Sequence, residues 1–160
     1  EAGSTAGLKG RKVDIYQGGV VVPFIVKWKN KVGANKIDST SILTTVDLLP
    51  TFSKLAGVDV PKDYKIDGED IISIFDNKPF KREKPLFWEW RFPNTNNNHW
   101  AEGAIRKGDY KLLFNTKINR TELYNIVKDP FEKFNIIENN QEIVKNLQEN
   151  WNDWKNELPK

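Results

Sequence analysis

The feature that most constrains the fold is a long apolar run near the start of the chain. Residues 20–28 read VVVPFIVKW and are rich in β-branched side chains. Such a run is typical of a strand buried on both faces, as in a parallel sheet flanked by helices. Pro23 has no amide hydrogen to donate, so regular pairing is expected to begin after it. The run predicts a strand from Val20 to Trp28 within an α/β domain.

A glycine-rich, basic loop precedes this run. Glycines recur through residues 3–19, and Lys9, Arg11 and Lys12 lie among them. Glycine permits sharp turns and close backbone approach, and positive charge in such a loop suits an oxyanion. An ordinary surface loop with solvated lysines fits the same composition, because short basic runs are common. Composition alone leaves both interpretations open.

The composition excludes several classes of function. The 160 residues include 25 Lys and Arg against 22 Asp and Glu, so the net charge is only +3 and the electrostatic case for a nucleic-acid partner is weak. Mean hydropathy is −0.63, and no apolar run approaches the ~18 residues that a membrane span needs. Cysteine is absent, which removes disulfides, thiolate metal sites and thiol nucleophiles.

The middle of the chain predicts one helix and then a connection. Asp47 is a good N-cap candidate, and apolar residues at helical spacing follow it as far as Gly57. This pattern predicts a core helix, and we assign Asp47 no catalytic role. Residues 61–84 are rich in proline and charge, which predicts a crossing to a smaller domain, with a helical turn near residues 69–75.

The last part of the chain predicts a small α+β unit. Two of its expected strands form a hairpin around Lys107-Gly108. Apolar residues at three- and four-residue steps predict a helix over residues 141–158 that covers one face of an antiparallel sheet. The expected strands are Leu86–Arg91, Trp100–Arg106, Asp109–Phe114 and Glu122–Ile126, and the helix stripe is Ile143, Leu147, Trp151, Trp154 and Leu158.

A long motif in the basic loop carries a family resemblance. Residues 3–23 fit the pattern G-S-T-x-G-L-[KR]-G-x-K-x4-[EQ]-G-G-[IV]-x-V-P. This pattern resembles the segment that follows the last metal ligands in type I sulfatases, members of the alkaline phosphatase superfamily. The later runs AIRKGDYKLL and ELYNIVKDPFE are similar to the hairpin and tail of the same family. The resemblance covers nearly the whole chain and corresponds to the C-terminal third of a sulfatase.

The resemblance implies three parts. Residues 1–60 would end an alkaline phosphatase-like catalytic α/β domain, residues 61–84 would connect, and residues 85–160 would form a C-terminal subdomain with a four-stranded antiparallel sheet packed on a helix. The chain opens at Glu1, inside a motif and without a methionine or signal peptide, so we expect a fragment. The family implies a periplasmic or secreted enzyme.

The resemblance also implies the chemistry. In the family, the lysine five residues before [EQ]-G-G contacts the sulfate group, which makes Lys12 the expected catalytic residue. An ammonium group is a compact charge with three donors and suits a tetrahedral sulfate. The formylglycine nucleophile and the calcium ligands belong to the family's upstream region. We therefore expect this chain to bind no metal and to have no turnover alone, although the whole protein would be a sulfuric ester hydrolase.

The motif departs from the family at two positions. Family members usually have Glu before the glycine pair and Arg four positions later, where this chain has Gln17 and Val21. Both members of a plausible ion pair are absent together, so we interpret the change as a neutral structural swap. Arg106 lies in the hairpin motif, where we expect a structural ion pair.

Three residues are expected to contact a sulfated sugar. His99 follows an asparagine-rich loop at residues 94–98, and Arg91 and Trp100 flank the same loop. Aromatic faces stack on sugar rings, and the guanidinium fork matches sulfate oxygens. A lone histidine is more often a packing residue, so both roles stay open for His99. Alternation along LFWEWR favours Trp90 as a core side chain.

We favour the interpretation that the whole protein is a sulfatase that acts on a glycan sulfate. The WEWRFP strand is most similar to sulfatases of galactose or N-acetylgalactosamine sulfates. A phosphodiesterase or phosphonate hydrolase of the same superfamily is the alternative enzyme, and a non-catalytic sulfated-glycan-binding module is the alternative from another class. The apolar strand from Val20 to Trp28 would lack its neighbours in this chain, so we also expect self-association through it.

Overall fold

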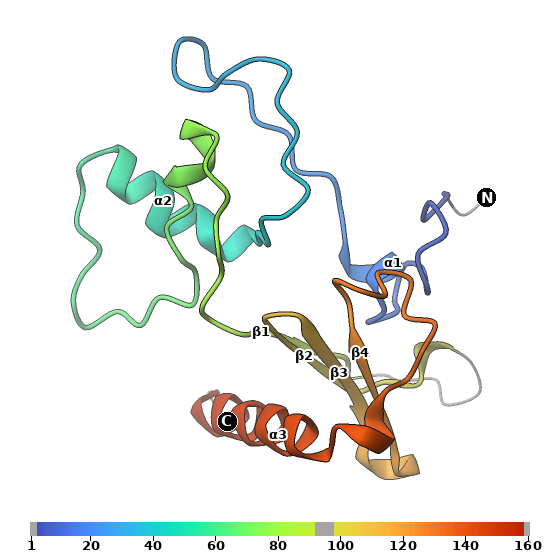
Figure 1. The fold of residues 1–160 in the computed structure, drawn as a ribbon. Coiled ribbons are helices and arrows are strands. Elements are labelled where there is room, and N and C mark those ends of the chain that lie inside the picture. Colours follow the sequence, from blue (N-terminus) through green and yellow to red (C-terminus); the bar gives the residue numbers. More distant parts are fainter. Residues whose placement is uncertain (1–2, 92–97, 159–160) are drawn as a thin grey trace. The chain divides into compact units, whose positions relative to one another are not determined.

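The computed structural model describes residues 3–91 and 98–158, which form two compact units (Figure 1). The first unit joins residues 1–22 to residues 85–160, and the second consists of residues 23–84. The two ends of the chain thus build one unit, and the middle of the chain builds the other. The expected asparagine loop at residues 94–98 lies largely outside the described residues.

The first unit contains a four-stranded antiparallel sheet in the order β1-β2-β3-β4. Its strands are β1 (Leu86–Glu89), β2 (Gly103–Lys107), β3 (Tyr110–Asn115) and β4 (Arg120–Asn125). Lys107 pairs with Tyr110 across a two-residue turn, and Gly108 takes a φ of 56° that suits such a turn. The expected four strands and their hairpin are confirmed.

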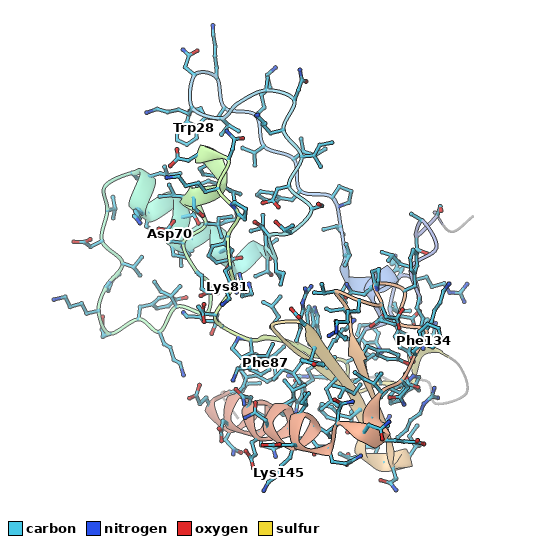
Figure 2. All side chains as sticks on the ribbon, in the orientation of Figure 1. Trp28, Asp70, Lys81, Phe87, Phe134 and Lys145 are labelled. Carbon is cyan, nitrogen blue, oxygen red and sulfur yellow. The ribbon has the colours of Figure 1, made fainter. Side chains whose placement is uncertain are left out.

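Helix α3 (Gln141–Glu157) covers one face of this sheet. Phe87 points from β1 toward the helix, whereas Lys145 points away from the sheet (Figure 2). The Phe87 ring stacks on Trp154 at a centroid distance of 4.7 Å, and Trp151 meets Phe114 edge-on at 4.9 Å. The expected apolar stripe is confirmed as the contact surface of the helix. The buried residues of the helix are two members of the stripe, Leu147 and Trp151, together with Val144, and they pack with Ile105, Leu112, Phe114 and Leu123.

The N-terminal segment covers the opposite face of the sheet. Ile15 and Tyr16, just before the short helix α1 (Gln17–Val20), pack with Trp100 and with strand residues that point away from α3. Strand side chains alternate between the two faces, so each face of this sheet has its own apolar cluster. Trp88 and Trp90 pack against the N-terminal cluster, which agrees with a core role for Trp90. The strand residues on this face are Ala104, Leu113 and Tyr124.

The expected strand from Val20 to Trp28 is not formed. Val20 ends α1, and residues 21–28 have no regular secondary structure. Val22 and Ile25 are 76% and 89% exposed. A doubly buried strand needs a paired neighbour on each side, and within residues 3–91 and 98–158 every strand belongs to the β1–β4 sheet. The apolar pattern is present in the sequence, but this chain supplies no partner strands for it.

The second unit is built around the buried carboxylate of Asp47. It precedes helix α2 (Leu48–Leu55) and accepts hydrogen bonds from the amides of Thr44 at 2.8 Å and Glu69 at 2.9 Å. It also forms an ion pair with Arg82. Asp47 therefore has a structural role, in agreement with the expectation that it is not catalytic. Short 3₁₀ helices lie at Thr45–Asp47 and Ile72–Asp76 in this unit, and at Asn98–Trp100, Thr116–Ile118 and Ile137–Asn139 in the first.

Candidate functional site: the Lys12 turn and its anchors

Lys12 lies in a tight turn ahead of α1. The Asp14 amide donates to the Arg11 carbonyl oxygen at 2.9 Å, and the Arg11 amide donates to Asp14 Oδ2 at 2.7 Å. Between them, Val13 has a φ of 75°, a region that β-branched residues rarely adopt. The Lys12 side chain is exposed and forms no hydrogen bond or ion pair with any other described residue. The turn thus presents an ammonium group that is available to an anion.

The glycine pair of the motif lets α1 lie directly on this turn. The Gly18 amide donates to the Lys9 carbonyl oxygen at 2.7 Å. A Cβ on Gly19 would lie 2.1 Å from the Asp14 carbonyl oxygen, and a Cβ on Gly18 would lie 2.5 Å from that of Gly10. Such approaches leave no room for a side chain. The Q-G-G sequence is therefore explained by backbone contact between the helix and the turn.

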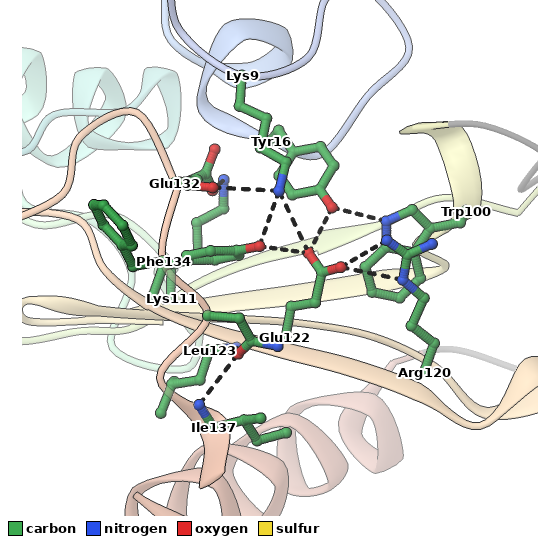
Figure 3. A network of polar contacts seen from close by, with 12 residues as sticks. Lys9, Tyr16, Trp100, Lys111, Arg120, Glu122, Leu123, Glu132, Phe134 and Ile137 are labelled. Atoms are coloured by element: carbon green, nitrogen blue, oxygen red, sulfur yellow. Dashed lines mark hydrogen bonds and ion pairs between the residues drawn. The ribbon is translucent and has the colours of Figure 1, made fainter. Parts of the chain in front are cut away.

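A buried carboxylate on β4 anchors this segment to the sheet (Figure 3). Glu122 Oε2 accepts hydrogen bonds from the hydroxyls of Tyr16 at 2.5 Å and Tyr124 at 2.7 Å, and Arg120 Nη2 donates to Oε1 at 2.7 Å. Burial tends to raise the pKa of Glu122, but these hydrogen bonds outweigh it and leave the pKa below its usual value. Burial and the bond to Glu122 raise the pKa of both tyrosine hydroxyls. Glu122 is thus a stable anion that holds Tyr16.

Lys9 forms the second anchor. Its Nζ donates to Tyr124 Oη at 2.9 Å and to the Glu132 carbonyl oxygen at 3.2 Å. The same Nζ lies 4.2 Å from the centre of the Tyr16 ring, within the range of a cation–π interaction. Its ammonium is committed to these partners, so Lys9 is a structural cation of the loop, in contrast to Lys12.

The third anchor is a fully buried ion pair between Lys111 and Glu132. Lys111 Nζ lies 3.0 Å from Glu132 Oε1 and donates to Gln17 Oε1 at 3.2 Å, while Glu132 Oε2 accepts from the Gln17 amide at 2.7 Å. Burial lowers the pKa of Lys111 to about 8 despite the attraction of Glu132. Gln17 therefore completes a polar cluster beneath α1. Val21, the other departure from the family motif, is half exposed.

His99 reaches the Lys12 turn from the sheet side. Its Nδ1 contacts Asp14 Oδ1, and only 15% of its side chain is exposed. The following residue, Trp100, is fully buried and donates from Nε1 to Tyr16 Oη at 2.9 Å. The structure therefore brings His99 into contact with Asp14, two residues after Lys12. It does not support a substrate contact by Trp100, because burial in the core leaves that side chain no surface for a ligand.

Arg91 lies elsewhere, at the end of β1. Its side chain is 78% exposed, and its Nε lies 3.8 Å from Glu89 Oε2. It lines an open cavity of about 520 Å³ between the sheet and α3. The cavity is also lined by Trp90, Lys117, Trp151 and Lys155. Arg91 is thus accessible, as a sugar-binding role requires, but it has no contact with the Lys12 turn.

Sequence reasoning missed the residues that hold the turn. Asp14, Glu122 and Glu132 each have one partner that is 85 to 115 positions away in the sequence, and no local pattern links the two. One signal was present: Lys111 and Glu122 are charged residues in strands whose neighbours are apolar. Charges at such positions must be paired when they are buried, so they point to a polar cluster.

The described residues offer no metal centre. Within residues 3–91 and 98–158, no three His, Cys, Asp or Glu side chains are grouped so that they could hold an ion. A calcium site of the kind implied by the family therefore does not fit the described part of this chain.

The motif, the turn and the antiparallel sheet all belong to one known family. Residues 11–157 match the family model for the C-terminal region of N-sulphoglucosamine sulphohydrolase. The chain belongs to this sulfatase family. A sulfatase of Formosa agariphila is 30% identical over 141 residues, which are 83% of this chain and 26% of that protein. An N-acetylgalactosamine-6-O-sulfatase of Bacteroides thetaiotaomicron is 26% identical over 155 residues, with 88% and 28% covered.

Solved structures show the same sulfatase fold. A structure of BT33336S-sulf, from work on the metabolism of multiple glycosaminoglycans by Bacteroides thetaiotaomicron, matches 94% of this chain and 32% of its own, with a TM-score of 0.74 and 23% identity. The structure of BT4656 in complex with its substrate, D-glucosamine-2-N,6-O-disulfate, matches 71% of this chain and 24% of its own, with a TM-score of 0.51 and 28% identity.

The sulfatase relatives are much longer than this chain. It covers 26% and 28% of the two relatives named above, and 32% and 24% of the two solved structures. Among the described residues, none of the helices has both the length and the apolar character needed to cross a bilayer.

Proposed function

We propose that this chain is the C-terminal portion of an enzyme that hydrolyses sulfate esters on a glycan, and that Lys12 binds the sulfate group. The observation that carries the proposal is the Lys12 turn itself. Three anchors hold the segment around it, two of them buried and the Lys9 anchor partly buried, yet the Lys12 ammonium has no protein partner among the described residues. An unpaired cation carried by a fixed turn matches the need of a sulfate site for positive charge.

The role of Lys12 is electrostatic. Its ammonium donors would meet the sulfate oxygens and the oxygen that leaves, so that negative charge developing on the ester oxygen is stabilised as the S–O bond breaks. When present, a formylglycine and a calcium ion would supply the attack on sulfur and the screening of the sulfate charge. We place both outside this chain. The glycan would contact His99 or Arg91, since both are at least partly accessible.

The relatives support a substrate class. One of them is named for N-acetylgalactosamine 6-O-sulfate, and a structural neighbour was solved with a sulfated glucosamine. We propose a sulfated amino sugar or galactose unit of a polysaccharide as the substrate. We place the enzyme in the periplasm or outside the cell, as the family resemblance implies.

The decisive test replaces Lys12 by alanine in the full-length enzyme. Sulfate release from an N-acetylgalactosamine 6-sulfate oligosaccharide should fall about 100- to 1,000-fold, the usual effect of removing one donor to a developing oxyanion. Lys128→Ala is the matched control, since Lys128 is also exposed on the first unit. Unchanged turnover in Lys12→Ala would contradict the proposal. Faster hydrolysis of a phosphate ester than of the sulfate ester would favour the phosphodiesterase alternative.

A further inference from the structure

We propose that Asp14 and His99 act as positioning residues that hold Lys12 in place for sulfate. The inference rests on the proposed function, because it assigns a task to residues beside the proposed sulfate-binding lysine. Its starting point is that Asp14, two residues after Lys12, uses both carboxylate oxygens within the protein. Only 1% of the Asp14 side chain is exposed.

The first Asp14 oxygen closes the Lys12 turn. Oδ2 accepts the hydrogen bond from the Arg11 amide at 2.7 Å. Lys12 and Val13 therefore lie between Arg11 and Asp14, which this side-chain hydrogen bond ties together. Without this bond, the turn would keep only the backbone contact from the Asp14 amide to the Arg11 carbonyl oxygen.

The turn needs such support because its conformation is strained. Val13 has a φ of 75°, and a β-branched residue adopts this region only where the surroundings enforce it. Strain of this kind is concentrated at functional sites, where it holds a group in a required direction. Here the group next to Val13 is Lys12. The carboxylate of Asp14 supports this turn through its hydrogen bond to the Arg11 amide.

The second Asp14 oxygen connects the turn to the sheet unit through His99. Asp14 Oδ1 contacts His99 Nδ1, and His99 is fixed in turn by its neighbour Trp100. The Trp100 carbonyl oxygen accepts from Asn115 Nδ2 at 2.6 Å, and its indole donates to Tyr16. The backbone next to His99 is therefore held in place by the contacts of Trp100. A buried carboxylate requires such a partner, since an unpaired charge in the interior is costly.

The geometry thus assigns His99 a role through Asp14, apart from any contact with the sugar. A histidine that touched a sugar hydroxyl would affect only ligands that carry the sugar. A histidine that aims Lys12 would also affect the binding of inorganic sulfate, which has no sugar. This difference gives a direct test of the two roles.

The test measures the dissociation constant of inorganic sulfate for the full-length protein by isothermal titration calorimetry. Lys12→Ala should weaken sulfate binding at least 10-fold. His99→Leu, which removes the contact to Asp14 at similar volume, should weaken it about 5- to 10-fold. His99→Gln, which keeps a side-chain N–H for Asp14, should stay within about 3-fold of the parent. Lys128→Leu is the control and should leave the constant unchanged.

A double variant separates positioning from a general structural effect. If His99 acts through the lysine, Lys12→Ala with His99→Leu should bind sulfate no more weakly than Lys12→Ala alone. Effects that multiply would overturn the proposal and indicate an independent contact. If Lys12→Ala weakens binding but His99→Leu does not, the positioning role alone is wrong. If Lys12→Ala has no effect, the sulfate site itself is wrong and the positioning role falls with it.

Folding of each variant is checked by tryptophan fluorescence, because Trp100 lies next to His99 and reports on this region. Should His99→Leu fail to fold, Asp14→Asn provides the second route. Asparagine keeps an acceptor for the Arg11 amide but lacks the charge that faces His99. Sulfate binding weakened about 5-fold or more in folded Asp14→Asn supports the proposal, and unchanged binding overturns it.

Discussion

At the scale of single residues, the first unit depends on a few charges that are almost completely buried. Glu122 is the clearest case, because one carboxylate receives two tyrosine hydroxyls and a guanidinium. Hydrogen bonds to a charged group are roughly twice as strong as neutral ones. The anion thus fixes the register between the N-terminal segment and β4, which are 106 positions apart at the Tyr16–Glu122 contact.

Glu122→Gln should lower the free energy of unfolding at neutral pH by about 1.5–3 kcal/mol, and this difference should depend on pH. The pKa of Glu122 is lowered from its ordinary value of 4.5 in the folded protein, so its charge contributes stability that is complete above 4.5. That contribution is lost as the pH falls below 4.5 through the folded pKa. Urea unfolding from pH 7 to pH 3 should show the parent and the variant converging in acid. Glu138→Gln, at an exposed position, should track the parent throughout.

Lys111→Met should destabilise the protein by about 3–5 kcal/mol, because it leaves Glu132 buried without its partner. Adding Glu132→Gln should restore part of the loss, since a neutral amide at position 132 can still accept from the Gln17 amide. Urea denaturation of the single and double variants measures both effects. A single variant as stable as the parent would show that the ion pair contributes nothing.

These buried charges lay beyond sequence reasoning for a physical reason. Lys12 could be singled out because its motif is local and its spacing to the glycine pair is fixed. Asp14 meets His99 and Glu122 meets Tyr16 through tertiary contacts between segments roughly 80 to 110 residues apart. No periodicity along the chain encodes such a pairing. Trp100 was misassigned for the same reason, since an aromatic residue beside a loop is compatible with either burial or exposure.

At the scale of elements, local pattern was a good guide where an element packs on something within the chain. The four strands and α3 follow from alternation and from a helical stripe, because the sheet and the helix bury each other's apolar faces. The run at residues 20–28 has an equally clear pattern but no partner strand among the described residues. The pattern of apolar residues predicts which face of an element is buried. A strand also needs a neighbouring strand to pair with its backbone N–H and C=O groups.

The contact between α1 and the Lys12 turn can be broken without touching a charge. Gly19→Ala places a Cβ 2.1 Å from the Asp14 carbonyl oxygen, and that neighbour is backbone rather than a flexible side chain. The turn must therefore shift, and amide hydrogen exchange in residues 9–20 should become at least 10-fold faster. Gly3→Ala is the matched control, because no atom lies within 4 Å of the added Cβ. Equal protection in both variants would argue against backbone contact as the reason for the glycine pair.

At the scale of the whole molecule, large apolar side chains remain in solvent where the first unit leads into the second. Val22 at the end of the first unit is 76% exposed, and Ile25 and Ile37 in the second are 89% and 96% exposed. Exposed apolar surface of this kind marks a site that associates with other protein. In the proposed enzyme, the remainder of the catalytic domain would cover it.

This chain on its own should therefore self-associate. Light scattering coupled to size-exclusion chromatography should show species larger than a monomer at micromolar concentration. Replacing Val22 by Thr and Ile25 by Ser should shift the distribution toward the monomer. Both side chains are largely exposed, so the change removes apolar surface from solvent without disturbing the packing inside the chain. Exposed Val127, replaced by Thr on the first unit, is the control. A strictly monomeric parent would contradict the expectation.

The first unit is assembled from both ends of the chain, with residues 23–84 inserted between them. During synthesis, the ribosome therefore delivers Lys12 before its supports. Tyr16 must wait for Glu122, and Gln17 must wait for Glu132. While residues 13–132 are being added, a nascent polypeptide would carry the proposed sulfate-binding group without the means to aim it, so that activity would be withheld until the final strands have left the exit tunnel.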